Sequence, residues 1–176
     1  VPDNWLRYDN PWEFSRNEHL HPIKFYGKMV TRHDANGKEL KCWIDTEDVM
    51  AMAYDVPIPG YGNDVVNTMR LWSAKSTREF DLHFFIEGKY LEALEKKMLT
   101  ENISKVLYPP DQVKEGKELR VKQEYFLSSA TIQDILYRFK KKYDDLRLLP
   151  GNVAIQLNDT HPALAIPEMM RLLTCH

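Results

Sequence analysis

The period of the apolar residues changes along this chain, and the change limits the folds that the chain can adopt. Residues 65–75 alternate with the period of two that is typical of a β-strand. Both faces carry apolar side chains, so we expect a strand covered on both sides. In residues 87–107 the apolar positions recur every three or four residues, which predicts a helix, and a second helix is predicted at roughly 118–143. The chain is therefore expected to combine strands with helices.

The N-terminal part favours a β-hairpin. Residues 23–31 and 39–46 favour strands, and an Asn-Gly pair between them supplies a turn that tolerates positive φ. The first 22 residues are aromatic and interrupted by prolines, which indicates an irregular extended segment held on a core. Residues 47–57 are apolar with β-compatible spacing, and two prolines and two glycines within residues 57–62 predict a rigid loop.

The C-terminal part has the order strand, polar loop, helix from which α/β folds are built. Residues 153–157 have the composition of a short buried strand, residues 158–162 form the polar loop, and residues 163–173 have helical spacing. We therefore predict the fold class to be α/β.

Composition limits the possible partners. The chain has 176 residues, 43% hydrophobic and 28% charged, which are the size and proportions of one ordinary globular domain or two very small ones. Its 24 basic and 26 acidic side chains leave a formal charge of −2, which gives no reason to expect a nucleic acid or an anionic membrane as partner. No apolar run reaches the ~20 residues of a membrane helix, and no signal peptide is visible. The two cysteines, Cys42 and Cys175, favour a reducing, cytoplasmic compartment.

The loop at 158–162 is the first candidate site, because ligands of open α/β sheets bind at the carboxyl ends of strands, near helix N-termini. Asp159 and His161 lie there, and a carboxylate beside an imidazole could orient a sugar hydroxyl or transfer a proton. The alternative is structural. Asp159 or Thr160 would cap the helix, Pro162 would occupy its first turn, and His161 would be buried and hydrogen-bonded.

Other positions are weaker candidates. Asp111 lies between two helices in the proline- and glycine-framed loop 108–117, which either gates a site or is a plain connection. Arg70 lies inside a strand and needs an anionic partner, either a bound phosphate or a structural carboxylate. His19 and His21 are close in sequence, but no cysteine or carboxylate completes a metal set of recognisable spacing, so we expect no metal site.

Longer motifs carry a more specific signal. The strongest are VVNTMRLWSAK at 65–75 and QLNDTHP at 156–162. Shorter blocks in a matching order are 9–13, 26–27, 57–61, 101–104, 106–109, 115–120 and 122–126. On these blocks the chain resembles the glycogen/starch α-glucan phosphorylase family over essentially its whole length.

This resemblance implies a longer protein of two Rossmann-like lobes with a glycosyltransferase B-like architecture. Residues 1–176 would form an incomplete N-terminal lobe with an attached β-hairpin region and two long helices. The implied reaction is phosphorolysis of terminal α-1,4 bonds of glycogen, starch or maltodextrin by inorganic phosphate, which releases glucose 1-phosphate with retention. The implied cofactor is pyridoxal 5'-phosphate, bound to a lysine of the C-terminal lobe. No lysine of this chain matches that motif, so the segment alone is expected to be inactive.

The resemblance also implies roles for single residues. Asp159 and His161 match the motif whose acidic residue lines the glucosyl pocket, and Arg120 matches a charge that supports this pocket. Asp111 falls in the family's mobile gate loop. Gln112 stands where many members have an asparagine that touches the sugar.

Two segments match regulatory elements of the family. Residues 88–107 resemble the subunit-contact (tower) helix of a homodimer, and the gate loop at 108–117 follows directly, so a shift of the helix would pull the loop. Arg138 and Arg70 are the candidate contacts to an allosteric phosphate. AMP-regulated members have two adjacent arginines where this chain has Tyr137 and Arg138, so weak AMP activation is expected.

A second hypothesis is non-catalytic. The chain does not begin with Met, so it is either processed or a piece of something longer. In this alternative it is a truncated product that can only associate with other subunits.

Overall fold

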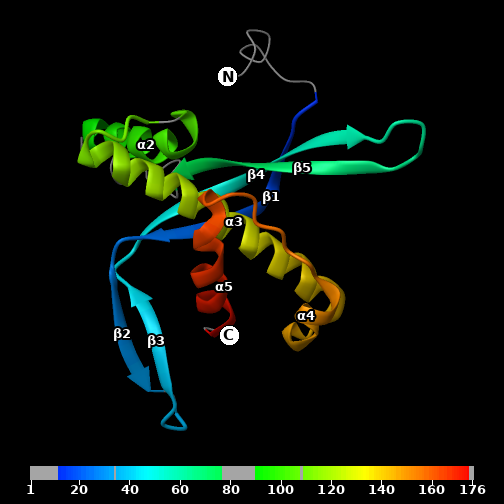
Figure 1. Cartoon of the computed structure of the whole chain (residues 1–176). Helices are drawn as coiled ribbons and strands as arrows, with labels where there is room; N and C mark the ends of the chain where they lie inside the picture. Colours follow the sequence, from blue (N-terminus) through cyan, green and yellow to red (C-terminus); the bar gives the residue numbers. More distant parts are fainter. Residues whose placement is uncertain (1–11, 34, 77–89, 108, 175–176) are drawn as a thin grey trace.

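The structure is a computed structural model that describes residues 12–33, 35–76, 90–107 and 109–174. Strands precede helices within these ranges (Figure 1), which confirms the expected combination of α and β structure. The expectations for residues 1–11 and 77–89 lie outside the described residues.

An antiparallel sheet in the order β1-β4-β5 supports the rest of the fold. β1 (Phe14–Phe25) pairs with β4 (Glu47–Pro59), whose other edge pairs with β5 (Val66–Ser76). Residues 14–22 are therefore strand, and the expectation of an irregular segment over this part is wrong. The ladder partner of these residues lies more than 25 positions away, so local composition did not reveal the pairing.

β4 continues through Pro57 and Pro59, so the loop predicted to begin at Pro57 starts only at Gly60. β1 accompanies β4 as far as Asp55, whereas β5 accompanies it to Pro59. Beyond Asp55, one edge of β4 has no partner among the described residues. Two prolines two positions apart can both turn their nitrogen towards that edge, where no donor is needed.

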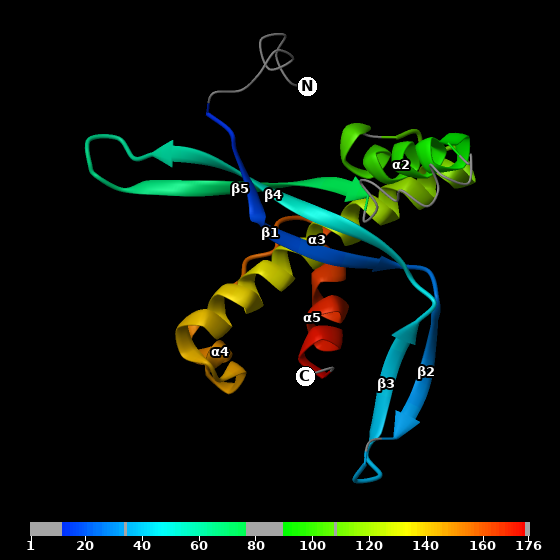
Figure 2. The same ribbon diagram turned by 180° about the vertical axis from the view of Figure 1, so that it is seen from behind.

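The outer half of β5 differs from expectation in its exposure. The β4–β5 ribbon extends beyond the rest of the sheet (Figures 1 and 2), and Val66, Met69 and Leu71 are exposed there. Only the inner half of β5 reaches the core, through the buried Ala74. The prediction that both faces are covered therefore fails for the outer half.

The predicted β-hairpin is confirmed as β2 (Lys28–His33) paired with β3 (Glu39–Ile44). It projects away from the sheet (Figures 1 and 2) after a sharp bend at Tyr26 and Gly27, which both have positive φ. A Cβ on Gly27 would lie 2.4 Å from the Ile44 carbonyl oxygen, so the bend requires glycine.

Two helices pack on the sheet. α2 (Tyr90–Lys105) lies within the predicted helix at 87–107, and α3 (Lys114–Tyr143) begins four residues before the predicted start at 118. The hydrophobic core between α3, the end of α2 and the sheet consists of Ile23, Phe25, Val49, Ala51, Ala74, Ile103, Phe126 and Ala130.

The C-terminal residues fold against the second half of α3. The 3₁₀ helix η2 (Leu146–Leu148) and the short helix α4 (Leu149–Asn152) reverse the chain, and the 3₁₀ helix η3 (His161–Leu164) leads into α5 (Ala165–Thr174). The helix predicted at 163–173 is thus confirmed. A second core cluster joins these elements through Ile132, Leu136, Phe139, Leu149 and Ala165.

The strand predicted at 153–157 is not formed. These residues pair with no strand among those described, and every described pairing is antiparallel. A strand needs a neighbour to satisfy its backbone groups, so an apolar composition alone does not produce one. The strand, loop, helix order is reduced here to its loop and helix.

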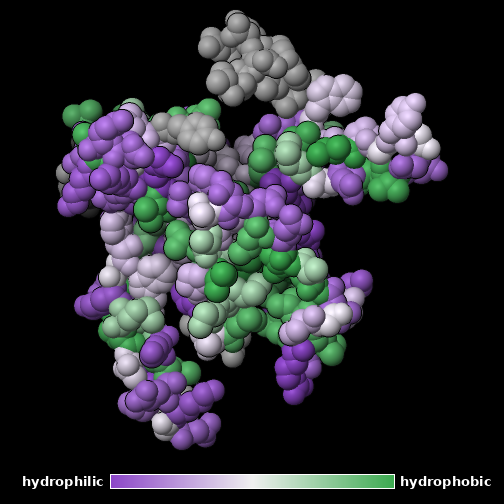
Figure 3. Space-filling view, viewed as in Figure 1, coloured by the Kyte–Doolittle hydropathy of each residue, from purple (hydrophilic) through white to green (hydrophobic). Residues whose placement is uncertain are grey.

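The surface around α5 is apolar. Figure 3 shows hydrophobic side chains gathered over this part of the molecule, where Ile166, Met170 and Leu173 are exposed. None of the described helices is both long and apolar enough to cross a bilayer.

Candidate functional site

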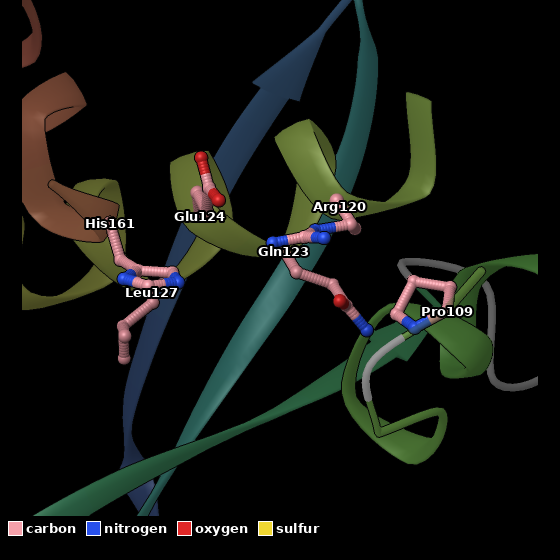
Figure 4. A pocket seen from close by; sticks show the side chains of 6 residues that line it. All are labelled: Pro109, Arg120, Gln123, Glu124, Leu127 and His161. Atoms are coloured by element: carbon pink, nitrogen blue, oxygen red, sulfur yellow. The ribbon is translucent and has the colours of Figure 1, made fainter. Parts of the chain in front are cut away.

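A hollow of ≈180 Å³ opens where α3 meets the residues before it and the 3₁₀ helix η3. Figure 4 shows the side chains that line it, which are Pro109, Arg120, Gln123, Glu124, Leu127 and His161. The lining combines an apolar floor with a guanidinium, a carboxylate, an amide and an imidazole. Such a mixture of apolar surface and a few polar groups is typical of small-ligand sites.

Helical geometry explains the α3 side of the hollow. Gln123 and Glu124 follow Arg120 by three and four residues and precede Leu127 by four and three, so all four share one face of the helix. The same spacing places Gly116 one turn before Arg120, where the preceding segment folds back on α3. A Cβ on this glycine would lie 1.6 Å from the Pro110 carbonyl oxygen, so only glycine allows the close contact.

An ion pair holds the predicted gate-loop residue to this face. The Nη1 atom of Arg120 donates to the Oδ2 atom of Asp111 over 2.8 Å. Both side chains are substantially exposed, so the pair orients Asp111 more than it stabilises the fold. Gln112 is exposed and does not line the hollow. The residues 114–117, predicted as loop, are the first turn of α3.

Asp159 and His161 form a second pair, beside the hollow. The imidazole Nδ1 lies 3.2 Å from the Asp159 Oδ2, while Asp159 Oδ1 accepts the Thr160 amide hydrogen over 2.7 Å. The Thr160 amide and the nearby His161 hold the pKa of Asp159 below its ordinary value. Asp159 has a φ of 65°, which turns the chain sharply into η3.

The structural alternative for this loop holds only in part. Thr160 stands at the N-cap of η3 without a side-chain cap bond, and Pro162 occupies the first turn as expected. The His161 side chain is 51% exposed, so the expectation of a buried imidazole is wrong. The loop therefore presents both its imidazole and its carboxylate to solvent, and the imidazole also lines the hollow.

The fold thus brings four of the predicted site residues into one region. Arg120 and His161 line the same hollow, Asp111 is bound to Arg120, and Asp159 is paired with His161. Because Arg120 on α3 and His161 in η3 are about 40 positions apart in sequence, this grouping exists only in the folded chain.

Arg70 and Arg138 lie in a separate charged cluster between the sheet and α3. Arg70 Nε and Nη2 donate to the two carboxylate oxygens of Asp55 over 2.7 and 2.8 Å, and its Nη1 donates to Asp134 Oδ1 over 2.8 Å. One alternative for Arg70 was a structural carboxylate, and the fold supplies two, from Asp55 and Asp134. Arg138 reaches the other oxygen of Asp134 over 3.0 Å, with 60% of its side chain exposed.

The carboxylates of this cluster are strongly acidic. Hydrogen bonds from Arg70, opposed by burial and helped by Arg16, lower the pKa of Asp55 from 3.8 to about 2. Burial alone would raise the pKa of Asp134, but His21, Arg138 and Arg70 outweigh burial, so the pKa lies below its ordinary value. Neither acid was predictable from sequence spacing, because they lie 15 and 64 positions from the arginine that they bind.

His19 and His21 also face Asp134, with ring nitrogens 3.9 and 3.7 Å from its Oδ1. A carboxylate thus accompanies the two histidines, which sequence spacing did not reveal. Across the described ranges, no three His, Cys, Asp or Glu residues are grouped so that they could hold a metal ion.

Comparison with known proteins gives a consistent result. The glycogen phosphorylase of Chlamydia pneumoniae is 56% identical over 173 residues, which are 98% of this chain and 21% of that protein. The brain form of glycogen phosphorylase from Bos taurus is 56% identical and the muscle form from Ovis aries 54% identical. Each is aligned over 179 residues, which are 97% of this chain and 21% of the relative. The chain thus spans about a fifth of the length of these curated relatives. The carbohydrate phosphorylase family matches residues 1–176, and the chain belongs to this family.

Proposed function

We propose that the protein containing this chain is an α-glucan phosphorylase. It cleaves terminal α-1,4 bonds of glycogen, starch or maltodextrin with inorganic phosphate and releases glucose 1-phosphate. The observation that carries the proposal is the hollow in which Arg120 and the paired His161 meet, within a chain that belongs to the carbohydrate phosphorylase family throughout.

The described residues have distinct tasks in this proposal. Asp159 and His161 line the glucosyl pocket, where the charged carboxylate orients a hydroxyl group of the sugar. Arg120 supports the pocket and fixes Asp111, so that residues 109–113 of the predicted gate loop, with Gln112, close over the bound sugar. Asp159 is ionised at neutral pH, as expected of a carboxyl whose pKa lies below its ordinary value, and it can therefore accept a hydrogen bond.

The cofactor of the family reaction is pyridoxal 5'-phosphate, which supplies a phosphate group for acid/base chemistry. The six residues that line the hollow include no lysine that could bind its aldehyde, so the hollow does not fit its Schiff-base site. In the proposal a C-terminal lobe carries the cofactor, and the lobe to which this chain contributes is Rossmann-like within a glycosyltransferase B-like architecture.

A homodimer in the cytoplasm is part of the same proposal. α2, within the tower segment 88–107, carries apolar side chains that are exposed and available for a subunit contact, namely Leu91, Leu94, Met98 and Leu99. α2 ends at Lys105, with two residues between it and the gate loop, so a displaced helix would shift Asp111 relative to Arg120.

An allosteric phosphate is proposed at Arg138, beside Arg70. Arg138 is largely exposed, whereas the guanidinium of Arg70 is bound to two carboxylates, so Arg138 is the better placed of the two for a phosphate from solvent. Tyr137 offers one hydroxyl in place of a second guanidinium, which weakens the hold on a dianion.

The proposal is tested with the complete protein. Purified protein, glycogen and inorganic phosphate are incubated with pyridoxal 5'-phosphate, and glucose 1-phosphate is measured over time. Steady release is expected. Absence of release, together with association with active phosphorylase subunits in a pull-down, would favour the non-catalytic alternative.

A further inference from the structure

A buried carboxylate in α5 joins this helix to α3. Glu168 is only 3% exposed, and its two oxygens accept four hydrogen bonds. Arg171, one turn later on α5, donates through Nε over 2.7 Å and through Nη2 over 2.8 Å. Ser129 donates over 2.5 Å and Tyr125 over 3.0 Å, both from α3.

Burying a charged group is unfavourable unless it is paired and hydrogen-bonded, and Glu168 meets both conditions. Arg171 on its own helix supplies the opposite charge, so the charge does not require contact with α3. The two hydroxyl donors are the part of the arrangement that spans the two helices. They fix the distance and the rotation of α5 relative to α3, because a hydroxyl bond tolerates only a few tenths of an ångström of change.

The donors remain donors at any ordinary pH. Burial, with the nearby charge of Glu168, raises the pKa of the Tyr125 hydroxyl well above its ordinary value. The Ser129 hydroxyl also accepts a hydrogen bond from Gln133 over 3.0 Å, and Gln133 donates to the Pro22 carbonyl oxygen over 2.9 Å. The network therefore extends from α5 through α3 to β1.

The hollow lies on the same stretch of both elements. Tyr125 follows Glu124 directly, Ser129 comes two residues after Leu127, and both Glu124 and Leu127 line the hollow. On the other side, His161 lies in η3, which runs without a break into α5. A shift of α5 relative to α3 would therefore move His161 relative to Arg120.

We propose that Glu168 is a positioning residue for the candidate site. Its carboxylate, held by Ser129 and Tyr125, sets the separation between η3 and α3 and so keeps His161 opposite Arg120. The inference rests on the proposed phosphorylase function for its effect on activity, but its structural part stands on the contacts alone.

The test uses the complete protein and the variant Glu168→Gln, which keeps the size of the side chain but removes its charge and replaces one of the two accepting oxygens by an NH2 donor. Val49→Ala is the control, because Val49 is buried on β4 and is neither part of α5 nor among the residues that line the hollow. The two variants are compared by urea unfolding, hydrogen exchange of the backbone amides at 160–165, and kcat and KM for phosphorolysis. Exchange measured under native conditions reports local opening separately from global stability.

We expect Glu168→Gln to raise exchange at 160–165 at least tenfold and to lower kcat/KM at least tenfold. Val49→Ala should leave the exchange rate and kcat/KM within twofold of wild type, even if it lowers the urea midpoint as much as Glu168→Gln does. Ser129→Ala should raise exchange in the same segment. Its effect should not add to that of Glu168→Gln, because both changes disturb the same hydrogen bond between Ser129 and Glu168. If Glu168→Gln does not fold, Ser129→Ala and Tyr125→Phe test the same point with one donor removed each.

The inference is overturned if exchange at 160–165 is unchanged in the folded variants, or if Glu168→Gln and Val49→Ala affect exchange and kcat/KM equally. An inactive wild-type protein would reject the proposed function instead, and the exchange measurement would still decide the inference.

Discussion

The charged cluster around Asp55 makes stability depend on pH in a way that can be measured. Asp55 is buried and accepts two hydrogen bonds from Arg70 and one from Arg16. Its pKa is about 2 in the folded protein and takes its ordinary value of 3.8 when the chain unfolds. The folded state therefore favours the charged form, and this contribution to stability is fully present above pH 4 and is lost as the pH falls through about 2.

The size of the effect follows from the two pKa values. A difference of one unit between the folded and unfolded pKa corresponds to about 1.36 kcal/mol. The ionised Asp55 therefore contributes roughly 2 kcal/mol to the free energy of unfolding at pH 6. At pH 3 about half of this contribution remains. Asp55→Asn removes the charge at every pH, so its cost should shrink by about 1 kcal/mol between pH 6 and pH 3.

Urea unfolding at both pH values measures this difference, with the change in midpoint converted through the slope of the transition. Asp64→Asn, on the exposed turn between β4 and β5, is the matched control and should change stability by no more than about 0.5 kcal/mol at either pH. Comparing variant with wild type at each pH cancels the titration of the groups that lie outside this charged cluster. If Asp55→Asn costs the same at pH 6 and pH 3, the pairing does not hold the Asp55 pKa low and the reasoning fails.

Three further outcomes are expected of the complete protein. Asp159→Asn should lower phosphorolysis much more than it lowers the urea midpoint, because Asp159 is an exposed acceptor beside the hollow, and equal effects would mean a purely structural role. AMP should activate weakly or not at all, because Tyr137 replaces a guanidinium and each missing charge-assisted bond is worth roughly 1.5–3 kcal/mol; strong activation at micromolar AMP in an activity titration would contradict this. Gly116→Ala should lower the free energy of unfolding by at least about 1 kcal/mol and raise KM for the glucan. The new Cβ would meet the Pro110 carbonyl oxygen and displace the segment that carries Asp111. Unchanged urea unfolding and kinetics would show that the structure relaxes around this contact.

Elements governed by local chemistry were predictable from the sequence. The hairpin β2–β3 follows from strand-forming residues around an Asn-Gly turn, and α2, α3 and α5 follow from apolar residues at helical spacing. The candidate residues Asp159 and His161 were predictable for the same reason, since two residues apart they must be close in space. The family too was apparent, because blocks such as residues 65–75 are specific in themselves.

Tertiary structure decided everything that depends on distant partners. β1 is a strand because β4 lies beside it, β4 runs through two prolines because one of its edges is unpaired there, and residues 153–157 are not a strand because no described strand pairs with them. The carboxylates that bind Arg70 and the hydroxyls that bind Glu168 come from other elements, 15 to 64 positions away. A sequence determines which groups need a partner, since buried charges and backbone polar groups must be satisfied, but only the packing of strands and helices determines which partner each one meets.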